Sequence, residues 1–307
     1  MLYVYAREQQ AEYLSLLQQS LPNIEIVGWP TSVSPEDVAY IAAWMPPEDF
    51  FRPYKNLKTI FALGAGVDKF LARTDIAPEV QIVRLTDAGM AQQMIEYCLY
   101  GVLHYQRQID FYALQQQQNQ WLPRDTCLAR DVRVTVLGLG ELGCRVATFL
   151  SQMGYMVSGW SRTQKDVAGV TCYSGQTGLE QVLSQTDVLF SVLPSTPETQ
   201  HLLNQHSLAL MPKGSAIINA GRGSLIDEPA LLALLDQAHF RFVLLDVYAK
   251  EPLDPAHSFW QHPRVIMTPH VAADTIVADA VTQICDNLRR IQQGQTPTGL
   301  VSRSQGY

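Results

Sequence analysis

Three side chains in the C-terminal half have the types that acid–base chemistry on a carboxylate-bearing substrate needs. Arg222 lies in INAGRGSLIDE, Glu251 in LLDVYAKEP and His270 in VIMTPHVA, each after a strand-like apolar run. In open α/β sheets, ligands bind outside the carboxyl ends of parallel strands. We therefore expect a guanidinium, a carboxylate and an imidazole at one sheet edge, which is the outline of a hydride-transfer site.

Taken alone, each of these residues has a more ordinary interpretation. Arg222 would be a phosphate-binding or surface arginine, Glu251 a turn residue before Pro252, and His270 one of seven histidines. The remaining histidines occur in no comparable motif and are assigned structural roles: His104, His201, His206, His239, His257 and His262. The catalytic interpretation depends on the three groups together and on a nucleotide motif upstream.

That nucleotide motif is VRVTVLGLGELG, residues 132–143, which has the pattern of a strand entering a glycine turn and a helix. Gly138 permits the tight turn, Gly140 lets backbone N–H groups approach a pyrophosphate, and Gly143 allows close helix–sheet packing. Apolar residues with helical period follow until Gly154, which favours a dinucleotide site over a chance glycine-rich turn. The predicted cofactor contacts of this turn are Gly138, Leu139, Gly140, Glu141, Leu142 and Gly143.

The residues after the next strand indicate which dinucleotide binds. A site for NAD usually has Asp or Glu about 20 residues on, hydrogen-bonded to the adenosine ribose. This chain has Ser161, Arg162 and Thr163 there, followed by Lys165. A carboxylate that would repel a 2′-phosphate is missing and a guanidinium that binds one is present, so we expect NADPH rather than NADH. The alternative is that Arg162 and Lys165 form only a solvated charged turn.

The elements that would carry these groups form two alternating series. The first has the strand-like runs LYVYA, IEIVGW, AYIAAW, KTIFALGAG and QIVRL, separated by helical pieces. The second has VRVTVLG, YMVSGW, DVLFSVLP, SAIINAG, FVLLDVY and VIMTP, rich in the aliphatic residues of a sheet covered on both faces. A helix is predicted over residues 90–118 and a closing helix over 274–293.

This order predicts an α/β fold of two Rossmann-like, doubly wound parallel-sheet domains with an interdomain cleft. The closing helix is expected to return to the first domain. A flavodoxin-like substrate-binding domain would then comprise residues 1–98 and 273–307, and an NADP-binding Rossmann domain residues 99–272.

Bulk properties exclude several classes. A chain of 307 residues can hold two domains, and a net charge of −7 argues against nucleic acid as a partner. The five cysteines are scattered without a CxxC pair, so neither disulfides nor a metal site is expected, and the cytoplasm is the predicted compartment. No secretory signal and no run of membrane-spanning length is found, so no membrane association is expected.

Together, the motifs resemble the D-isomer-specific 2-hydroxyacid dehydrogenase family and, within it, the glyoxylate/hydroxypyruvate reductase A group. The resemblance covers nearly the whole chain, in FALGAGVD, GLGELG, WSRT, LPSTPET, NAGRGSLIDE, DVYAKEP, TPHVA and the terminal QGY. It implies an NADPH-dependent reductase of small 2-oxo acids, converting glyoxylate to glycolate and hydroxypyruvate to D-glycerate, and a homodimer.

The resemblance also implies roles for the three groups. His270 would donate the proton during reduction, because an imidazole titrates near working pH. Glu251 would pair with the other ring nitrogen and favour the protonated form. Arg222 would orient the substrate's carboxylate and stabilise charge on its carbonyl oxygen.

Further contacts follow from the same resemblance. The backbone of Gly64, Ala65, Gly66 and Val67 would bind the substrate carboxylate, although an ordinary glycine turn is the alternative. Trp44, followed by Met45, would wall the pocket unless it belongs to the core, and Trp121 would either reach toward a partner subunit or anchor its own loop. The remaining predicted cofactor contacts are Leu193, Pro194, Ala220, Gly221 and Asp246.

Other functions stay open at this point. A dehydrogenase for a bulkier acid, such as phenylpyruvate, 3-phosphoglycerate or D-lactate, would share the motifs, although we identify no extra cations for a phosphorylated substrate. A nucleotide-sensing binding protein of the C-terminal binding protein type would share the fold. A methyltransferase would use the glycine turn but would not need the Arg, Glu and His groups.

Overall fold

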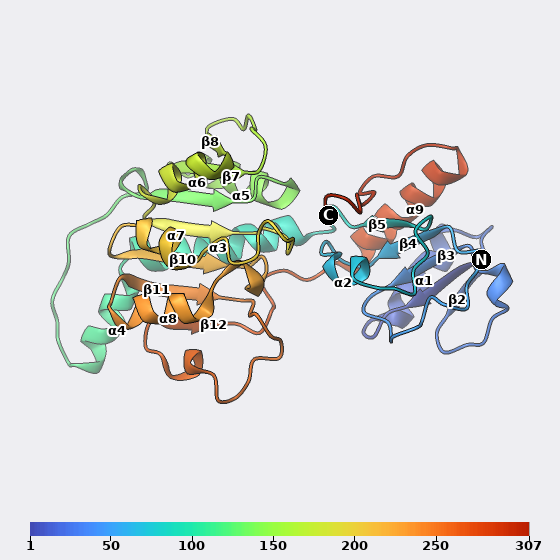
Figure 1. Cartoon of the computed structure of the whole chain (residues 1–307), viewed down its shortest axis with the longest axis horizontal. Coiled ribbons are helices and arrows are strands. Elements are labelled where there is room, and N and C mark those ends of the chain that lie inside the picture. The colour runs from blue at the N-terminus through green and yellow to red at the C-terminus, as the bar shows by residue number, and fades with distance from the viewer. Residues whose placement is uncertain (307) are drawn as a thin grey trace. The chain divides into compact units, whose positions relative to one another are not determined.

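The computed structural model describes residues 1–306 and divides the chain into two compact units. Unit 1 comprises residues 1–90 and the chain from Thr275 onward, and unit 2 comprises Ala91–Asp274. Each unit is built around its own sheet (Figure 1). The boundaries predicted from the sequence, after residues 98 and 272, fall within helix α3 and in the loop before helix α9.

Unit 1 contains a five-stranded parallel sheet in the order β2-β1-β3-β4-β5, which is the flavodoxin order. The strands match the five expected runs: β1 Leu2–Tyr5, β2 Ile26–Gly28, β3 Tyr40–Ala43, β4 Thr59–Ala62 and β5 Gln81–Arg84. Its helices are α1 Gln10–Ser20, α2 Asp68–Leu71 and α9 Val277–Gln292, with a 3-10 turn at Pro35–Asp37. The closing helix α9 packs beside α1, so the end of the chain contributes to the first unit.

Unit 2 contains a seven-stranded parallel sheet in the order β12-β11-β10-β9-β6-β7-β8. Its strands are β6 Arg133–Leu137, β7 Met156–Ser161, β8 Thr171–Ser174, β9 Val188–Ser191, β10 Ser215–Asn219, β11 Phe240–Leu245 and β12 Val265–Met267. The strand order reverses between β6 and β9, which is the switch point where doubly wound sheets bind nucleotides. Two parallel α/β sheets confirm the predicted fold class.

Both faces of this sheet are covered, because successive strand residues point to opposite sides. Leu189 of β9 belongs to the apolar cluster that includes helices α6 to α8, whereas its neighbours Val188 and Phe190 belong to the cluster with α3 and α5. The helices of unit 2 are α3 Met90–Gln106, α4 Ile109–Gln117, α5 Glu141–Gln152, α6 Gly175–Leu183, α7 Gln205–Leu210 and α8 Glu228–Asp236. Short 3-10 turns lie at Ala129–Asp131, Gly223–Leu225 and Ser258–Gln261.

Two expectations about these elements were wrong. The helix predicted over residues 90–118 is interrupted, because Gln108 adopts a left-handed conformation with φ 58° and separates α3 from α4. Strand β8 was missed, because Thr171–Ser174 lies at the sheet edge, is only partly buried and lacks an aliphatic run.

Within residues 1–306, no helix has both the length and the apolar character needed to cross a membrane. The five cysteines are all free thiols. In the same residues, no three side chains of His, Cys, Asp or Glu are grouped as metal ligands would be.

Candidate active site

The glycine turn after β6 meets three different steric demands. Gly138 has φ +105°, a conformation that L side chains rarely adopt. A Cβ on Gly143 would lie 1.8 Å from the Gly138 carbonyl oxygen, so only glycine permits this approach of α5 to the turn. A Cβ on Gly140 would meet no atom within 4 Å. The space beside the Gly140 backbone is therefore open, and a ligand could approach the backbone there.

Helix α5 begins immediately after Gly140, and no side chain caps its N-terminus. The first N–H groups of a helix lack intrahelical partners and carry partial positive charge, which suits an anion. Four other predicted cofactor contacts follow the neighbouring strands β9 and β10: Leu193, Pro194, Ala220 and Gly221. A Cβ on Gly221 would lie 2.7 Å from the Leu193 carbonyl oxygen, so these two strand ends pack backbone to backbone.

The turn after β7 holds the groups predicted to bind a 2′-phosphate. Ser161 Oγ donates to the Thr163 carbonyl at 2.8 Å, while Arg162, Thr163 and Lys165 are exposed to solvent. Gln164, which the sequence did not single out, braces this turn against β8. Its Nε2 donates to the Cys172 carbonyl and its Oε1 accepts from Ser174 Oγ, at 3.2 and 3.0 Å.

The structure brings His270 and Glu251 together. His270 Nδ1 lies 2.8 Å from Glu251 Oε2, and the two side chains are 48% and 30% exposed. The hydrogen bond that His270 donates to Glu251 raises the pKa of His270, against the opposing effects of burial and of the positive charge of Arg222. Glu251 and Arg222 therefore both act electrostatically on His270 within unit 2.

Arg222 occupies the turn after β10, where a buried amide shapes the backbone. Asn219, which is fully buried, donates from Nδ2 to the Arg222 carbonyl at 3.1 Å and accepts from the Gly221 amide at 3.2 Å. The Arg222 guanidinium donates from Nη1 to the Gly221 carbonyl at 2.8 Å. Sequence reasoning missed Asn219, although an amide three residues before the arginine is a recognisable turn-forming residue.

Asp246, a predicted cofactor contact, binds the loop that carries His270 in this structure. It is 1% exposed, and its carboxylate accepts from Thr268 Oγ1 at 2.6 Å and from the amides of Val271 and Ala272 at 2.8 and 2.9 Å. Its carbonyl accepts from the His270 amide at 2.8 Å. Asp246 thus ties down the loop that carries the imidazole, where His270 itself has φ +58°.

Two hydroxyl groups extend this network, and no sequence pattern predicted either of them. Thr268 Oγ1 bonds both Asp246 Oδ1 and Tyr97 OH, each at 2.6 Å. Tyr97 comes from α3, and burial raises its pKa, so its hydroxyl stays protonated as a neutral hydrogen-bonding group. The loop behind His270 is therefore held by buried polar groups from β11 and α3.

In unit 1, the structure brings Trp44 to the loop of residues 64–67. A Cβ on Gly64 would lie 2.6 Å from the indole ring of Trp44, so the ring lies directly on this glycine. The ring also packs 6.3 Å from Phe70, between centroids, and Trp44 is partly buried against the apolar core of unit 1. The loop itself runs from the end of β4 to α2, with Ala65 and Gly66 half-buried.

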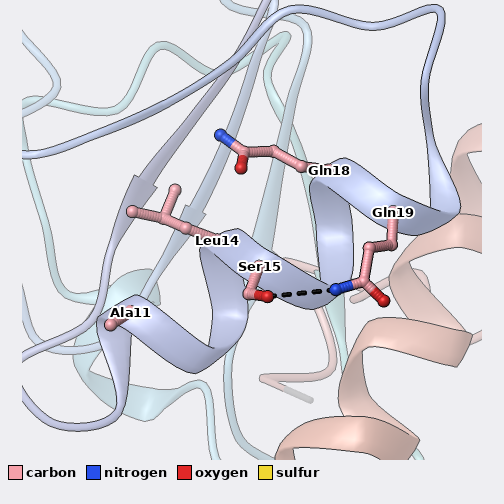
Figure 2. A pocket seen from close by; sticks show the side chains of 5 residues that line it. All are labelled: Ala11, Leu14, Ser15, Gln18 and Gln19. Atoms are coloured by element: carbon pink, nitrogen blue, oxygen red, sulfur yellow. Dashed lines mark hydrogen bonds between the residues drawn. The ribbon is translucent and has the colours of Figure 1, made fainter.

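A surface hollow of about 540 Å³ lies elsewhere in unit 1, along helix α1 (Figure 2). Its lining consists of five neutral side chains: Ala11, Leu14, Ser15, Gln18 and Gln19. Gln19 Nε2 donates to Ser15 Oγ at 3.1 Å. None of the predicted site residues lines this hollow, and its neutral groups offer no acid, base or nucleophile.

Residues 99–272 match the family model described as "D-isomer specific 2-hydroxyacid dehydrogenase, NAD binding domain". A protein of Serratia proteamaculans named glyoxylate/hydroxypyruvate reductase A is 41% identical over 302 residues, 96% of each chain. A protein of the same name from Photorhabdus laumondii is 40% identical over 302 residues, 97% of this chain and 96% of its own.

Solved structures agree with these relatives. A D-isomer specific 2-hydroxyacid dehydrogenase of Xanthobacter autotrophicus, crystallised with NADPH and MES, is 37% identical with a TM-score of 0.95, covering 100% of this chain and 99% of its own. An NADPH-dependent glyoxylate/hydroxypyruvate reductase of Sinorhizobium meliloti, in complex with NADP and sulfate, is 30% identical with a TM-score of 0.92 over the same shares.

Proposed function

Because the chain belongs to the D-isomer specific 2-hydroxyacid dehydrogenase family, we propose that it is an NADPH-dependent reductase of glyoxylate and hydroxypyruvate. The products are glycolate and D-glycerate. The observation that carries this proposal is the pair of His270 and Glu251, 2.8 Å apart in the same unit as the glycine turn. An imidazole held by a carboxylate is the proton donor that the reduction of a 2-oxo acid requires.

The residues present fit NADPH. The open side of Gly140 and the uncapped start of α5 suit a pyrophosphate, and the four residues directly after β7, at positions 162–165, include no carboxylate to repel a 2′-phosphate. Ser161, Arg162 and Lys165 supply donors and positive charge at that position, so we assign the 2′-phosphate to them. The bound cofactor supplies the hydride that reduces the keto carbon.

The side chains of unit 2 do the remaining work. Glu251 engages His270 Nδ1, which fixes the ring and leaves Nε2–H to protonate the substrate's carbonyl oxygen. The raised pKa keeps the imidazolium populated near neutral pH. Arg222 offers a planar guanidinium to the substrate carboxylate and to negative charge developing on the carbonyl oxygen.

The loop of residues 64–67 and the Trp44 ring, both in unit 1, favour a small substrate. Backbone N–H groups of residues 64–67 would bind the carboxylate, and Trp44, which lies on Gly64, would limit the length of the substrate side chain. A two-carbon or three-carbon 2-oxo acid satisfies both requirements.

The test is to follow NADPH absorbance with glyoxylate or hydroxypyruvate, and to repeat it with NADH. We expect turnover of both acids, with NADPH preferred. The variant H270Q should lose turnover while retaining NADPH binding, whereas H206Q, at an exposed histidine 4.0 Å from Glu180, should behave as wild type. A nucleotide-sensing protein would bind NADPH without turning over either acid, and that result would refute the proposal.

We also propose that two copies of the chain associate through helices α3 and α4 and the segment that follows. Large apolar side chains are exposed along this stretch: Tyr100, Leu103, Ile109, Tyr112, Leu114, Trp121, Leu122 and Leu128. Trp121 is 94% exposed, which is costly for an indole ring unless a partner covers it. Light scattering should give a dimer for the wild type and a larger monomer fraction for L114E.

Free thiols throughout residues 1–306 support a cytoplasmic location.

A further inference from the structure

The turn that carries Glu251 is held by a carboxylate from another element. Glu228 is the first residue of α8, and its Oε1 accepts a hydrogen bond of 3.0 Å from the Ala249 amide. Its Oε2 lies 3.4 Å from His257 Nε2. The side chains of Glu228 and His257 are only 17% and 23% exposed, so water competes little for these contacts.

The tautomer of His257 is fixed by its other nitrogen. His257 Nδ1 accepts from the Phe259 amide at 3.2 Å, so in the neutral ring the proton is on Nε2 and points at Glu228. Glu228 therefore receives one donor on each carboxylate oxygen. Both of its oxygens are used inside the protein.

The Ala249 amide is adjacent to the amide that Glu251 itself binds. Glu251 Oε1 accepts from the Tyr248 amide at 3.1 Å, and its Oε2 contacts His270 Nδ1 at 2.8 Å. Two successive amides of one turn thus face two carboxylates, of which one is the partner of the imidazole. A shift of the Ala249 amide would move the backbone on which Glu251 is built.

The same peptide is fixed from a second side. A Cβ on Gly223 would lie 1.9 Å from the Tyr248 carbonyl carbon and 2.4 Å from the Ala249 nitrogen. The Gly223 backbone therefore packs directly against the peptide bond between Tyr248 and Ala249. Gly223 follows Arg222 and precedes Glu228 in one segment. That segment therefore carries the guanidinium and also holds the turn of Glu251 by a steric contact and a hydrogen bond.

We propose that Glu228 is a positioning residue for the reaction: its carboxylate holds the Ala249 amide, and so sets Glu251 against His270. The inference rests on the proposed function, since it assigns a further residue to the same site. The charged groups that shift the pKa of His270 are Glu251, Arg222 and Asp246, and Glu228 is not among them. Its effect therefore passes through the turn.

The experiment compares E228A, E228Q and wild type in kcat, KM and the pH profile of kcat/KM. Misplacement of a catalytic group by a distant substitution costs up to about a hundredfold in rate, so we expect E228A to lower kcat by roughly tenfold or more. The loss of activity at high pH should move to lower pH, because Glu251 then stabilises the imidazolium less. E228Q keeps an oxygen acceptor for the Ala249 amide and should restore most of the rate.

The matched control is E180A, which removes a glutamate of unit 2 outside the site that also faces a histidine, with a side chain 43% exposed and 4.0 Å from His206. It should leave kcat and the pH profile unchanged. NMR titration of His270 in the cofactor-free protein should give a lower pKa in E228A than in wild type, and the NADPH dissociation constant should stay within about twofold, a small change on the free-energy scale.

The possible failures are distinguishable. A wild-type chain that turns over neither acid refutes the proposed function, and this inference with it. An active wild type, with E228A matching it in kcat and in the His270 titration, refutes this inference alone. If E228A does not fold, E228D decides, because its shorter side chain withdraws the carboxylate from the Ala249 amide. It should lower kcat and the pKa of His270, and wild-type values of both in E228D would overturn the inference. A tenfold loss with an unchanged pH profile would indicate a purely structural role and overturn the inference.

Discussion

His270 and Glu251 are 19 residues apart in the chain, yet Nδ1 of one lies 2.8 Å from Oε2 of the other. The reason is the pairing of β11 with β12, in which Leu245 is opposite Met267. Glu251 follows the first of these strands and His270 follows the second, so parallel pairing delivers both side chains to one edge. The contact is thus a direct consequence of the sheet topology.

Replacing the carboxylate should change the pH range of activity. The hydrogen bond that His270 donates to the Glu251 carboxylate is the largest cause of the raised pKa of His270, so in E251Q that pKa should fall. The reductase needs the imidazolium, so activity is lost as pH rises through this pKa, and in E251Q the loss should begin at lower pH. At neutral pH we expect a decrease in kcat/KM of about a hundredfold, typical of impaired general acid catalysis.

A pH–rate series for hydroxypyruvate, under saturating NADPH, measures this directly. An unchanged high-pH limb in E251Q would show that another group sets the proton affinity of His270.

Cofactor choice should depend on the turn after β7. Arg162 is exposed beside Ser161 in the turn assigned to the 2′-phosphate, so R162A should weaken NADPH binding and leave NADH binding nearly unchanged. Hydrogen bonds to charged groups contribute about 1.5 to 3 kcal/mol, which corresponds to roughly tenfold or more in KM for NADPH. The control is R289A, which removes an exposed arginine of α9 that pairs with Asp286. Equal losses for both cofactors would place the 2′-phosphate elsewhere.

A substitution in the glycine turn should weaken NADPH binding without changing the stability of the fold. Gly140 has φ −83°, and a Cβ there meets no protein atom within 4 Å, so G140A should fold with the melting temperature of wild type. The added methyl group would occupy the space assigned to the pyrophosphate. Thermal shifts measured with saturating NADPH should therefore be large in wild type and small in G140A. A full shift in G140A would exclude close approach of the cofactor to this residue.

The sequence was sufficient where a pattern maps directly to geometry. Apolar runs located eleven of the strands, and the residues placed behind two neighbouring runs, Glu251 and His270, do meet. The sequence was insufficient where a side chain binds a residue far away in the chain and neither residue belongs to a recognisable motif. Tyr97 and Thr268 are 171 positions apart, and nothing about an isolated hydroxyl predicts their contact. Asp246 stays a predicted cofactor contact, and nothing in the sequence indicated that its buried carboxylate also accepts from the Val271 amide in the loop of His270.

That loop supplies the last prediction. Thr268 Oγ1 joins Asp246 Oδ1 to Tyr97 OH, so T268V removes both hydrogen bonds while keeping the side-chain shape. Removing the partner of the part-buried Tyr97 hydroxyl, and one of the three donors to the buried Asp246 carboxylate, should lower the free energy of unfolding by about 1 to 3 kcal/mol. Because the amides of Val271 and Ala272 also depend on Asp246, the His270 loop should loosen, and kcat should fall by roughly tenfold.

Urea unfolding and steady-state assays on T268V measure the two effects separately. The control T282V removes an exposed hydroxyl on α9 that donates to the Ala278 carbonyl in its own helix, and it should change neither quantity. If T268V lost stability but kept the wild-type kcat, the Asp246 network would hold the fold without placing His270. A parallel loss of both quantities, with an unaltered NADPH dissociation constant, is the result expected if the buried carboxylate positions the imidazole.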